Sequence, residues 1–334
     1  MQTFEYSRPT TLDQAIQAGA RSKTAQQYAD VRFVAGGTTL VDLMKLDVER
    51  PNQLVDINGL ALDQIQSAPR GGVVIGALAR NAAVAHHPTI QRDYPVLSEA
   101  LLSGASPQLR NMATTAGNLL QRTRCVYFRD TAHACNKREP GTGCSAIGGH
   151  NRTLAILGTS KDCIATNPSD QNVALTALEA TIQVRGAKGE RSIPIGEFYL
   201  KPGTTPNRET VLEPGDLIVS VTLPAVEPGT RSHYLKLRDR AAYEFALSSA
   251  AVVINVSGGR IERVRVALGG VGTVPWRSHE AEEVLRGQRM SAAIFRKAAE
   301  AAMKDARPAS ENGFKVELAK RCIVRALTVS TQSA

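Results

Sequence analysis

The chain has 334 residues, of which 43% are apolar and 4% aromatic, and it carries a net charge of +9. Its length exceeds one ordinary hydrophobic core, so we expect two or three domains, and no uncharged run reaches the roughly 18 residues of a membrane-spanning helix, so we expect a soluble protein. Scattered basic residues with few aromatic ones disfavour nucleic-acid binding and fit an acidic protein partner or an anionic cofactor better.

The first third of the chain predicts short helices and strands around a glycine-rich turn. Thr11 and Gln14 match a capping box, which predicts a helix that continues to about Ala29. The strand at 31–34 runs directly into the turn Gly36-Gly37-Thr38-Thr39. Apolar periodicity predicts further strands at 55–57 and 72–76 and helices at 40–46, from 81 onward and at 95–102.

A second glycine-bearing turn, Ala113 to Asn118, precedes a segment that is rich in cysteine. Four of the five cysteines lie within 39 residues with the spacing C-x9-C-x8-C-x18-C, at Cys125, Cys135, Cys144 and Cys163. Prolines and glycines around the third cysteine indicate a loop, so we expect a metal cluster, a zinc ion or disulfides to hold these thiols together. Cys322 lies apart in a helical pattern and is interpreted as a buried apolar residue.

Helices and strands alternate again after the cysteine segment, and no internal repeat is found. Pro224 to Gly229 contains two prolines and a glycine, which indicates a linker between two domains. The pattern predicts helices at 173–180, 291–305 and 311–327, and strands at 181–185, 217–223, 250–256 and 263–268.

The two glycine turns have the chemistry of phosphate-binding loops. Glycines allow backbone N–H groups to approach an oxyanion, threonines add hydroxyl donors, and a following helix favours negative charge. A Gly-Gly turn alone is more often a tight connection, and the G-x-G-x-x-G and Gly-Lys-Ser/Thr patterns are missing. Two such turns favour a dinucleotide. Asp170 is a candidate acceptor for a hydroxyl of that dinucleotide, with a helix N-cap as its alternative role.

These motifs resemble, in order and spacing, the FAD-binding subunit of molybdenum hydroxylases, the xanthine dehydrogenase and CO dehydrogenase medium-subunit family. The matching motifs lie at 34–40, 114–118, 169–170, 216–218 and 268–271. The resemblance implies an α+β fold. Residues 1–224 would form a two-subdomain FAD-binding domain of the PCMH/vanillyl-alcohol-oxidase type, and residues 229–330 a C-terminal α+β domain of the CO dehydrogenase flavoprotein type.

The segment 119–167 departs from most of this family, which has a much shorter connection there. It resembles the insertion in the flavin subunit of periplasmic-type bacterial aldehyde oxidoreductases, and this implies a [4Fe-4S] cluster on Cys125, Cys135, Cys144 and Cys163. From spacing alone zinc ranks high, but the paired C-x2-4-C motifs of zinc sites are missing.

The resemblance also assigns the FAD contacts. Ile218 is expected against the isoalloxazine or the adenine, and Lys236 close to the flavin. The complete set is Val34, Ala35, Gly36, Gly37, Thr38, Thr39, Leu40, Ala113, Thr114, Ala116, Gly117, Asn118, Ser169, Asp170, Ile218 and Lys236.

The implied function is electron transfer, because no residue of this chain is expected to oxidise substrate. In the resembled heterotrimer, a large molybdopterin subunit hydroxylates an aldehyde, and a small subunit with two [2Fe-2S] clusters passes electrons to FAD in a subunit like this one. An external acceptor such as a quinone, a cytochrome, a dye or oxygen then receives them; NAD is expected less.

Two other functions stay open: the flavin subunit of an enzyme like 4-hydroxybenzoyl-CoA reductase, and a zinc-stabilised binding protein without enzymatic activity. The polar and acidic residues from Met1 to Thr11 lead us to expect no export signal in this chain. The resembled subgroup is exported as a folded complex with a signal-bearing partner, so we expect the periplasm, with the cytoplasm as the alternative.

Overall fold

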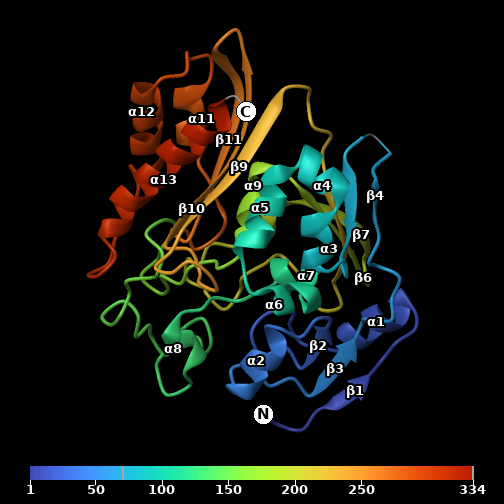
Figure 1. Ribbon diagram of the computed structural model, residues 1–334. Helices are drawn as coiled ribbons and strands as arrows, with labels where there is room; N and C mark the ends of the chain where they lie inside the picture. Colours follow the sequence, from blue (N-terminus) through green and yellow to red (C-terminus); the bar gives the residue numbers. More distant parts are fainter. Residues whose placement is uncertain (70, 333–334) are drawn as a thin grey trace.

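The computed structural model describes residues 1–69 and 71–332, and the strands within them form three sheets. The first sheet is parallel with the order β1-β3-β2, and it lies with α1 and α2 at the N-terminal end of the molecule (Figure 1). Its strands and helices are β1 (Glu5–Ser7), α1 (Leu12–Gly19), β2 (Val31–Val34), α2 (Leu40–Lys45) and β3 (Gln53–Asp56).

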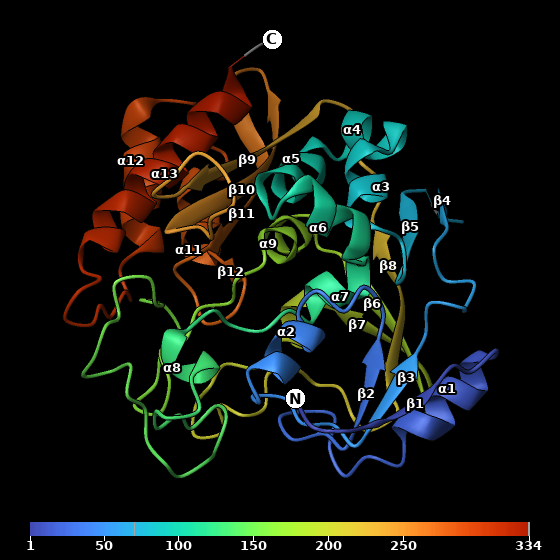
Figure 2. The ribbon, with the colours of Figure 1, turned by 60° about the horizontal axis from the view of Figure 1, so that its bottom comes forward.

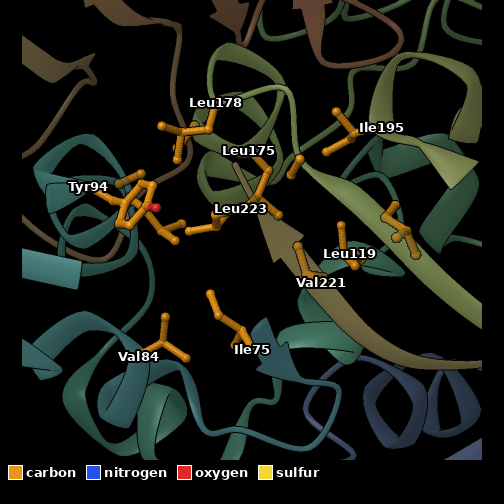
Figure 3. Close-up of a cluster of buried hydrophobic side chains, with 14 of the residues drawn as sticks. Ile75, Val84, Tyr94, Leu119, Leu175, Leu178, Ile195, Val221 and Leu223 are labelled. Atoms are coloured by element: carbon orange, nitrogen blue, oxygen red, sulfur yellow. The ribbon is translucent and has the colours of Figure 1, made fainter. Parts of the chain in front are cut away.

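The second sheet is antiparallel, with the order β4-β5-β8-β6-β7. Its strands are β4 (Ile65–Ser67), β5 (Val73–Gly76), β6 (Thr181–Gly186), β7 (Gly189–Pro194) and β8 (Leu217–Leu223). Apolar side chains of the strands, among them Ile75 and Val221, meet Val84 and Leu175 of the helices in one core (Figure 3). The accompanying helices are α3 (Asn81–His86), α4 (Pro88–Asp93), α5 (Pro95–Ser103), α6 (Pro107–Met112), α7 (Thr115–Leu119), α9 (Asp170–Ala177) and α10 (Ile195–Phe198).

The third sheet, β12-β11-β10-β9, is also antiparallel and uses both of its faces. Side chains alternate along β10, so Ala251 and Val253 join the core of the second sheet, while Val252 and Ile254 contact the C-terminal helices. The strands are β9 (Thr230–Leu237), β10 (Ser248–Ser257), β11 (Arg260–Gly269) and β12 (Trp276–Arg277), and the helices are α11 (His279–Leu285), α12 (Ala292–Ala302) and α13 (Phe314–Thr331).

The cysteine segment between α7 and α9 contains one helix in its described structure, α8 (Val126–Arg129), and is otherwise a long loop beside α2 (Figures 1 and 2). It has a small hydrophobic core of its own around Phe128 and Leu154. No helix of the described residues is both long and apolar enough to cross a membrane.

The fold class agrees with the sequence-based expectation, and β2 and β8 have the predicted bounds. The helix predicted from Thr11 to Ala29 is wrong beyond its second turn. Thr11 does cap α1 by accepting a hydrogen bond from the Gln14 N–H at 3.3 Å, but the helix ends at Gly19. The residues that follow are held instead by distant contacts, because the Gln26 amide donates to the carbonyl oxygens of Thr210 and Leu212.

Candidate functional site: two glycine turns, a row of cavities and a cysteine segment

The first glycine turn follows β2 and leaves several hydrogen-bond donors unused. Gly37 has a φ of +70°, a conformation that disfavours other residues. Within residues 1–69 and 71–332, no hydrogen bond is formed by the backbone N–H groups of Gly36, Gly37, Thr38 or Thr39, and the Thr39 hydroxyl makes no cap bond to α2. These donors are therefore free to bind an oxyanion.

The second turn lies directly against the first. A Cβ on Gly36 would overlap the carbonyl oxygen of Met112, one residue before the second turn. The second turn is itself rigid, because Thr114 Oγ1 accepts from the Gly117 N–H at 3.2 Å and the Ala116 N–H donates to the Ala77 carbonyl at 2.9 Å. Close packing without a side chain at Gly36 thus brings both predicted phosphate loops to one place.

Two polar residues that the sequence analysis missed connect the turns. Asn58 donates to the Ala35 carbonyl at 2.9 Å, and its own oxygen accepts from Arg80 at 3.1 Å. Arg80 also donates to the Met112 carbonyl. The pair Asn58–Arg80 therefore joins the first turn to the second. Neither residue belongs to a recognisable local motif, so no sequence pattern indicates this role.

Three neighbouring cavities run past the turns. The first, of about 170 Å³, lies between the two turns and Ile218. The second, of about 290 Å³, shares Thr38, Thr39 and Gly117 with the first and extends to Asp170 and Lys236. The third, of about 230 Å³, shares Asp170 with the second and ends against Cys125. Every residue that the sequence analysis assigned to FAD lines one of these cavities. That they bind FAD stays a prediction.

Asp170 and Lys236 form a buried ion pair at the junction of the second and third cavities. Lys236 Nζ lies 2.8 Å from Asp170 Oδ2, and their side chains are 2% and 9% exposed. Tyr234 donates from its hydroxyl to the other carboxylate oxygen at 2.5 Å, and burial, together with the Asp170 charge, raises the pKa of that phenol well above its ordinary value. Two side chains of β9 thereby hold the Asp170 carboxylate in a defined orientation.

The alternative that Asp170 is the N-cap of α9 is wrong, because Ser169 has that role. Ser169 Oγ accepts from the Asn172 N–H at 3.1 Å and donates to Asn118 Oδ1 at 2.7 Å. The cap therefore also ties α9 to the second glycine turn. Because Ser169 caps the helix, the Asp170 carboxylate is not needed for capping and can contact a ligand in the cavities.

Comparison with known proteins places this site in a family. Residues 2–226 match the model of the FAD binding domain in molybdopterin dehydrogenase, and residues 233–329 match the CO dehydrogenase flavoprotein C-terminal domain. The chain belongs to the molybdopterin dehydrogenase flavoprotein family. It is thus an FAD-binding subunit of an oxidoreductase.

Relatives of this flavoprotein match along nearly its whole length. The aldehyde oxidoreductase FAD-binding subunit PaoB of Escherichia coli (strain K12) is 48% identical over 335 residues, which covers 100% of both chains. The carbon monoxide dehydrogenase medium chain of Hydrogenophaga pseudoflava is 28% identical and covers 98% of this chain and 96% of its own. A solved structure of that enzyme, lacking the Mo-pyranopterin moiety of the molybdenum cofactor, superposes with a TM-score of 0.77 and 27% identity over 98% and 97% of the two chains.

The cysteine segment of this flavoprotein places its four thiols around one small core. Cys125, Cys135 and Cys163 are buried, Cys144 is half-buried, and all four are free thiols. Cys135 pairs with Cys144 in a short antiparallel bridge, and the Ala165 N–H donates to the Cys163 sulfur at 3.4 Å. Free thiols disagree with the disulfide alternative. Among the described residues, however, no three His, Cys, Asp or Glu side chains are grouped closely enough to hold a metal ion.

The surroundings of Cys125 and Cys163 favour neutral thiols when no metal is bound. Burial raises the pKa of the Cys125 thiol to about 12 and also raises that of Cys163, where the nearby charge of Lys137 opposes the shift. Metal binding to such thiols requires the release of their protons. Four cysteines near one small core are suitable in type and number to ligate a metal cluster. In this structure, however, their sulfur atoms are not gathered as in a closed metal site.

Two basic residues of the cysteine segment, Arg122 and Lys137, bind carboxylates. Arg122 pairs with Glu49 and Glu209, and Lys137 lies 2.9 Å from Glu209. Burial raises the pKa of Glu209, but the charges of Arg122 and Lys137 outweigh it and lower the pKa to about 2. This buried charge network holds the cysteine segment against the FAD-binding part of the chain.

Proposed function

We propose that this flavoprotein is the FAD- and [4Fe-4S]-containing electron-transfer subunit of a molybdenum-dependent aldehyde oxidoreductase. One observation carries the proposal: the row of cavities that starts at the two glycine turns ends against Cys125 in the cysteine segment. A flavin site and a thiol-rich site that share a wall suit a chain that moves electrons. The 48% identity to an aldehyde oxidoreductase FAD-binding subunit supports the choice of substrate class.

The charges of the cavities suit FAD with its pyrophosphate beside the glycine turns. Four cations and two carboxylates line the second cavity, which leaves an excess of two positive charges, and a pyrophosphate diester carries two negative ones. The unused N–H groups of the first turn add donors for its oxygens. The cations are Arg110, Arg124, Lys236 and Arg240, and the carboxylates are Asp170 and Glu244.

The sizes and linings of the cavities support one direction for the dinucleotide. The smaller first cavity, lined by apolar residues such as Ile218, accommodates the adenine, and the larger cavities at Asp170 and Lys236 accommodate the ribityl chain and the flavin ring. FAD supplies the two-electron chemistry when bound. The charge of Lys236 would stabilise negative charge on the ring, and the carboxylate of Asp170 would accept a hydrogen bond from a hydroxyl group of the cofactor.

Cys125, Cys135, Cys144 and Cys163 would hold the iron–sulfur cluster. Each is a free thiol, and all four belong to or pack against one small core. We place the FAD-binding domain at residues 1–224, with the segment 119–167 inserted, and the C-terminal domain at 229–330.

Electrons would reach this chain from a small subunit with two [2Fe-2S] clusters, after a large molybdopterin subunit has oxidised the aldehyde, and would leave to an external acceptor. We propose a heterotrimer of these subunits, in the periplasm after co-export with a signal-bearing partner. The positive net charge of +9 suits acidic surfaces on the partners.

Anaerobic purification of the chain with its partner subunits tests the proposal. FAD, iron and acid-labile sulfide are expected in the isolated complex, with flavin absorption at about 450 nm over a broad brown background. A loss of both absorptions when an aromatic or aliphatic aldehyde is added would show that the aldehyde reduces both groups, and would support the proposed aldehyde oxidoreductase activity. Reduction of a 4-hydroxybenzoyl-CoA substrate instead would identify the alternative reductase, and a colourless zinc-containing protein would contradict an electron-transfer role altogether.

A further inference from the structure

The third cavity lies between two walls that are distant in sequence. One wall comes from the cysteine segment and includes Cys125, Thr153 and Leu154. The facing wall includes Ser249 at the start of β10 and Gly269-Gly270 at the end of β11. A molecule in this cavity therefore contacts the cysteine segment and the third sheet together.

Lys315, in the first turn of α13, binds both walls from behind. Its Nζ donates to the carbonyl oxygens of Thr153 at 3.0 Å, Leu154 at 2.9 Å and Gly270 at 2.6 Å. The three N–H donors of an ammonium group are thus matched by three acceptors. One side chain joins the part of the cysteine segment that lines the cavity to the turn opposite it.

Neighbouring contacts also hold the cysteine segment in place, but they do not involve Gly269 or Gly270, the glycines that line the cavity. Asn312 donates to the carbonyl oxygens of Asn151, Leu154 and Ala155. The N–H groups of Ile156 and Leu157 donate to the Val271 carbonyl at 2.8 and 2.9 Å. Val271 follows Gly270 in the chain and does not line the cavity. Among the described side chains, Lys315 is the one hydrogen-bonded to both Thr153-Leu154 and Gly270.

A buried ammonium is a costly way to obtain packing alone. Lys315 is 0% exposed, and no carboxylate pairs with it in the described part of the chain. Burying a charge without a counter-ion disfavours the folded state, even where carbonyl oxygens accept its hydrogen bonds. The presence of a buried lysine at this position is explained if the connection that it makes between the two walls of the cavity also serves a function.

We propose that Lys315 is a positioning residue that couples the cysteine segment to the flavin cavity, so that FAD in the cavity orders the segment and a group held by the cysteines favours FAD binding. The inference rests on the proposed function, because it takes the third cavity as part of the FAD site. Such coupling is reciprocal: if bound FAD favours the ordered conformation of the cysteine segment, the ordered segment increases the affinity for FAD by the same factor.

Hydrogen exchange of the FAD-free and FAD-loaded chain in its complex tests the coupling. In the wild type, FAD is expected to slow exchange of the backbone amides of residues 151–166 at least about tenfold. In Lys315→Met the slowing is expected to fall below about twofold, while the amides of the glycine turns stay protected by FAD as before. Undiminished protection of residues 151–166 in this variant would overturn the proposal, as would an absence of FAD-dependent protection in the wild type.

Three further variants separate positioning from simple loosening. Lys320→Met removes another lysine of α13, one paired with Glu317 on the surface, and should behave as the wild type. Asn312→Ala loosens the segment but keeps both walls joined, so it should retain most of the FAD effect; a loss equal to that of Lys315→Met overturns the role of the lysine. If Lys315→Met does not fold, Lys315→Gln, which keeps two donors, should show a reduced effect, and a full effect there contradicts the proposal.

The readout does not depend on the metal. Iron and flavin analysis of the same preparations tests the proposed function separately. An iron-free wild type that still shows FAD-dependent protection of residues 151–166 would contradict the cluster and support the coupling, whereas an iron-loaded wild type without that protection would do the reverse.

Discussion

Gly36 is the residue on which the contact between the two glycine turns depends, because a Cβ there would overlap the backbone carbonyl of Met112. A backbone atom cannot rotate away, so Gly36→Ala must push the turns apart. We expect FAD affinity to fall about tenfold or more, equivalent to about 1.4 kcal/mol, as measured by quenching of flavin fluorescence during titration of the FAD-free protein.

The control is Gly196→Ala, because a Cβ at Gly196 meets no atom within 4 Å and lies outside the cavities. It should bind FAD as the wild type does. Equal affinities of the Gly36→Ala variant and this control would show that the packing of the turns is not what holds the cofactor.

Cys135 and Cys322 are both buried cysteines, and the proposed function gives them different roles. Cys135→Ser is expected to lose most of the iron bound per chain, because a hydroxyl is a poor substitute for a thiolate ligand. Cys322→Ser should keep its iron, since Cys322 packs within the C-terminal core. Iron and acid-labile sulfide assays of the two purified variants decide the matter, and full iron content in Cys135→Ser would remove that residue from the ligand set.

Among the secondary-structure elements, those with a clear local pattern were predictable. The alternation of apolar residues identified β8, and the glycine turn after Val34 marked the end of β2. The strand β9 was missed, since charged and polar residues interrupt its pattern at His233 and Lys236. Lys236 is nevertheless buried, because Asp170, a residue 66 positions away, neutralises it. Such pairing depends on tertiary structure, and local periodicity cannot reveal it.

The same limit applies to the candidate site. Glycine, threonine and cysteine spacing located the turns and the thiols, but the residues that support them, Asn58, Arg80 and Glu209, come from separate elements and were found only in the structure. The sequence therefore predicted what faces the cavities better than what holds them in place.

β9 also provides a prediction at the scale of an element. Lys236→Met would leave the buried Asp170 carboxylate without its cation, which typically costs about 3–5 kcal/mol. We expect the FAD-free variant to lose about that much unfolding free energy in urea denaturation. Lys320→Met removes a surface ion pair and should change it by less than about 1 kcal/mol; similar losses in both variants would contradict a special role for the buried pair.

At the scale of the whole molecule, α13 joins the cysteine segment to the third sheet through a charge that the fold tolerates poorly. Burial lowers the pKa of Lys315 from its ordinary 10.5 to about 7, and the nearby Arg152 charge acts in the same direction. Between these two values the unfolded chain binds the proton more tightly than the folded one. Raising the pH above about 7 therefore stabilises the folded state, until the unfolded lysine also loses its proton near its ordinary pKa.

One group with this shift contributes at most about 1.4 kcal/mol of unfolding free energy per pH unit. Urea denaturation of the FAD-free chain at pH 7 and pH 9 should thus show a gain of up to about 3 kcal/mol in the wild type that Lys315→Met lacks. Comparing the two proteins removes the contributions of other titrating groups. Identical pH dependence in both would mean that Lys315 keeps its proton in the fold, because its three carbonyl partners then compensate for the burial of the charge.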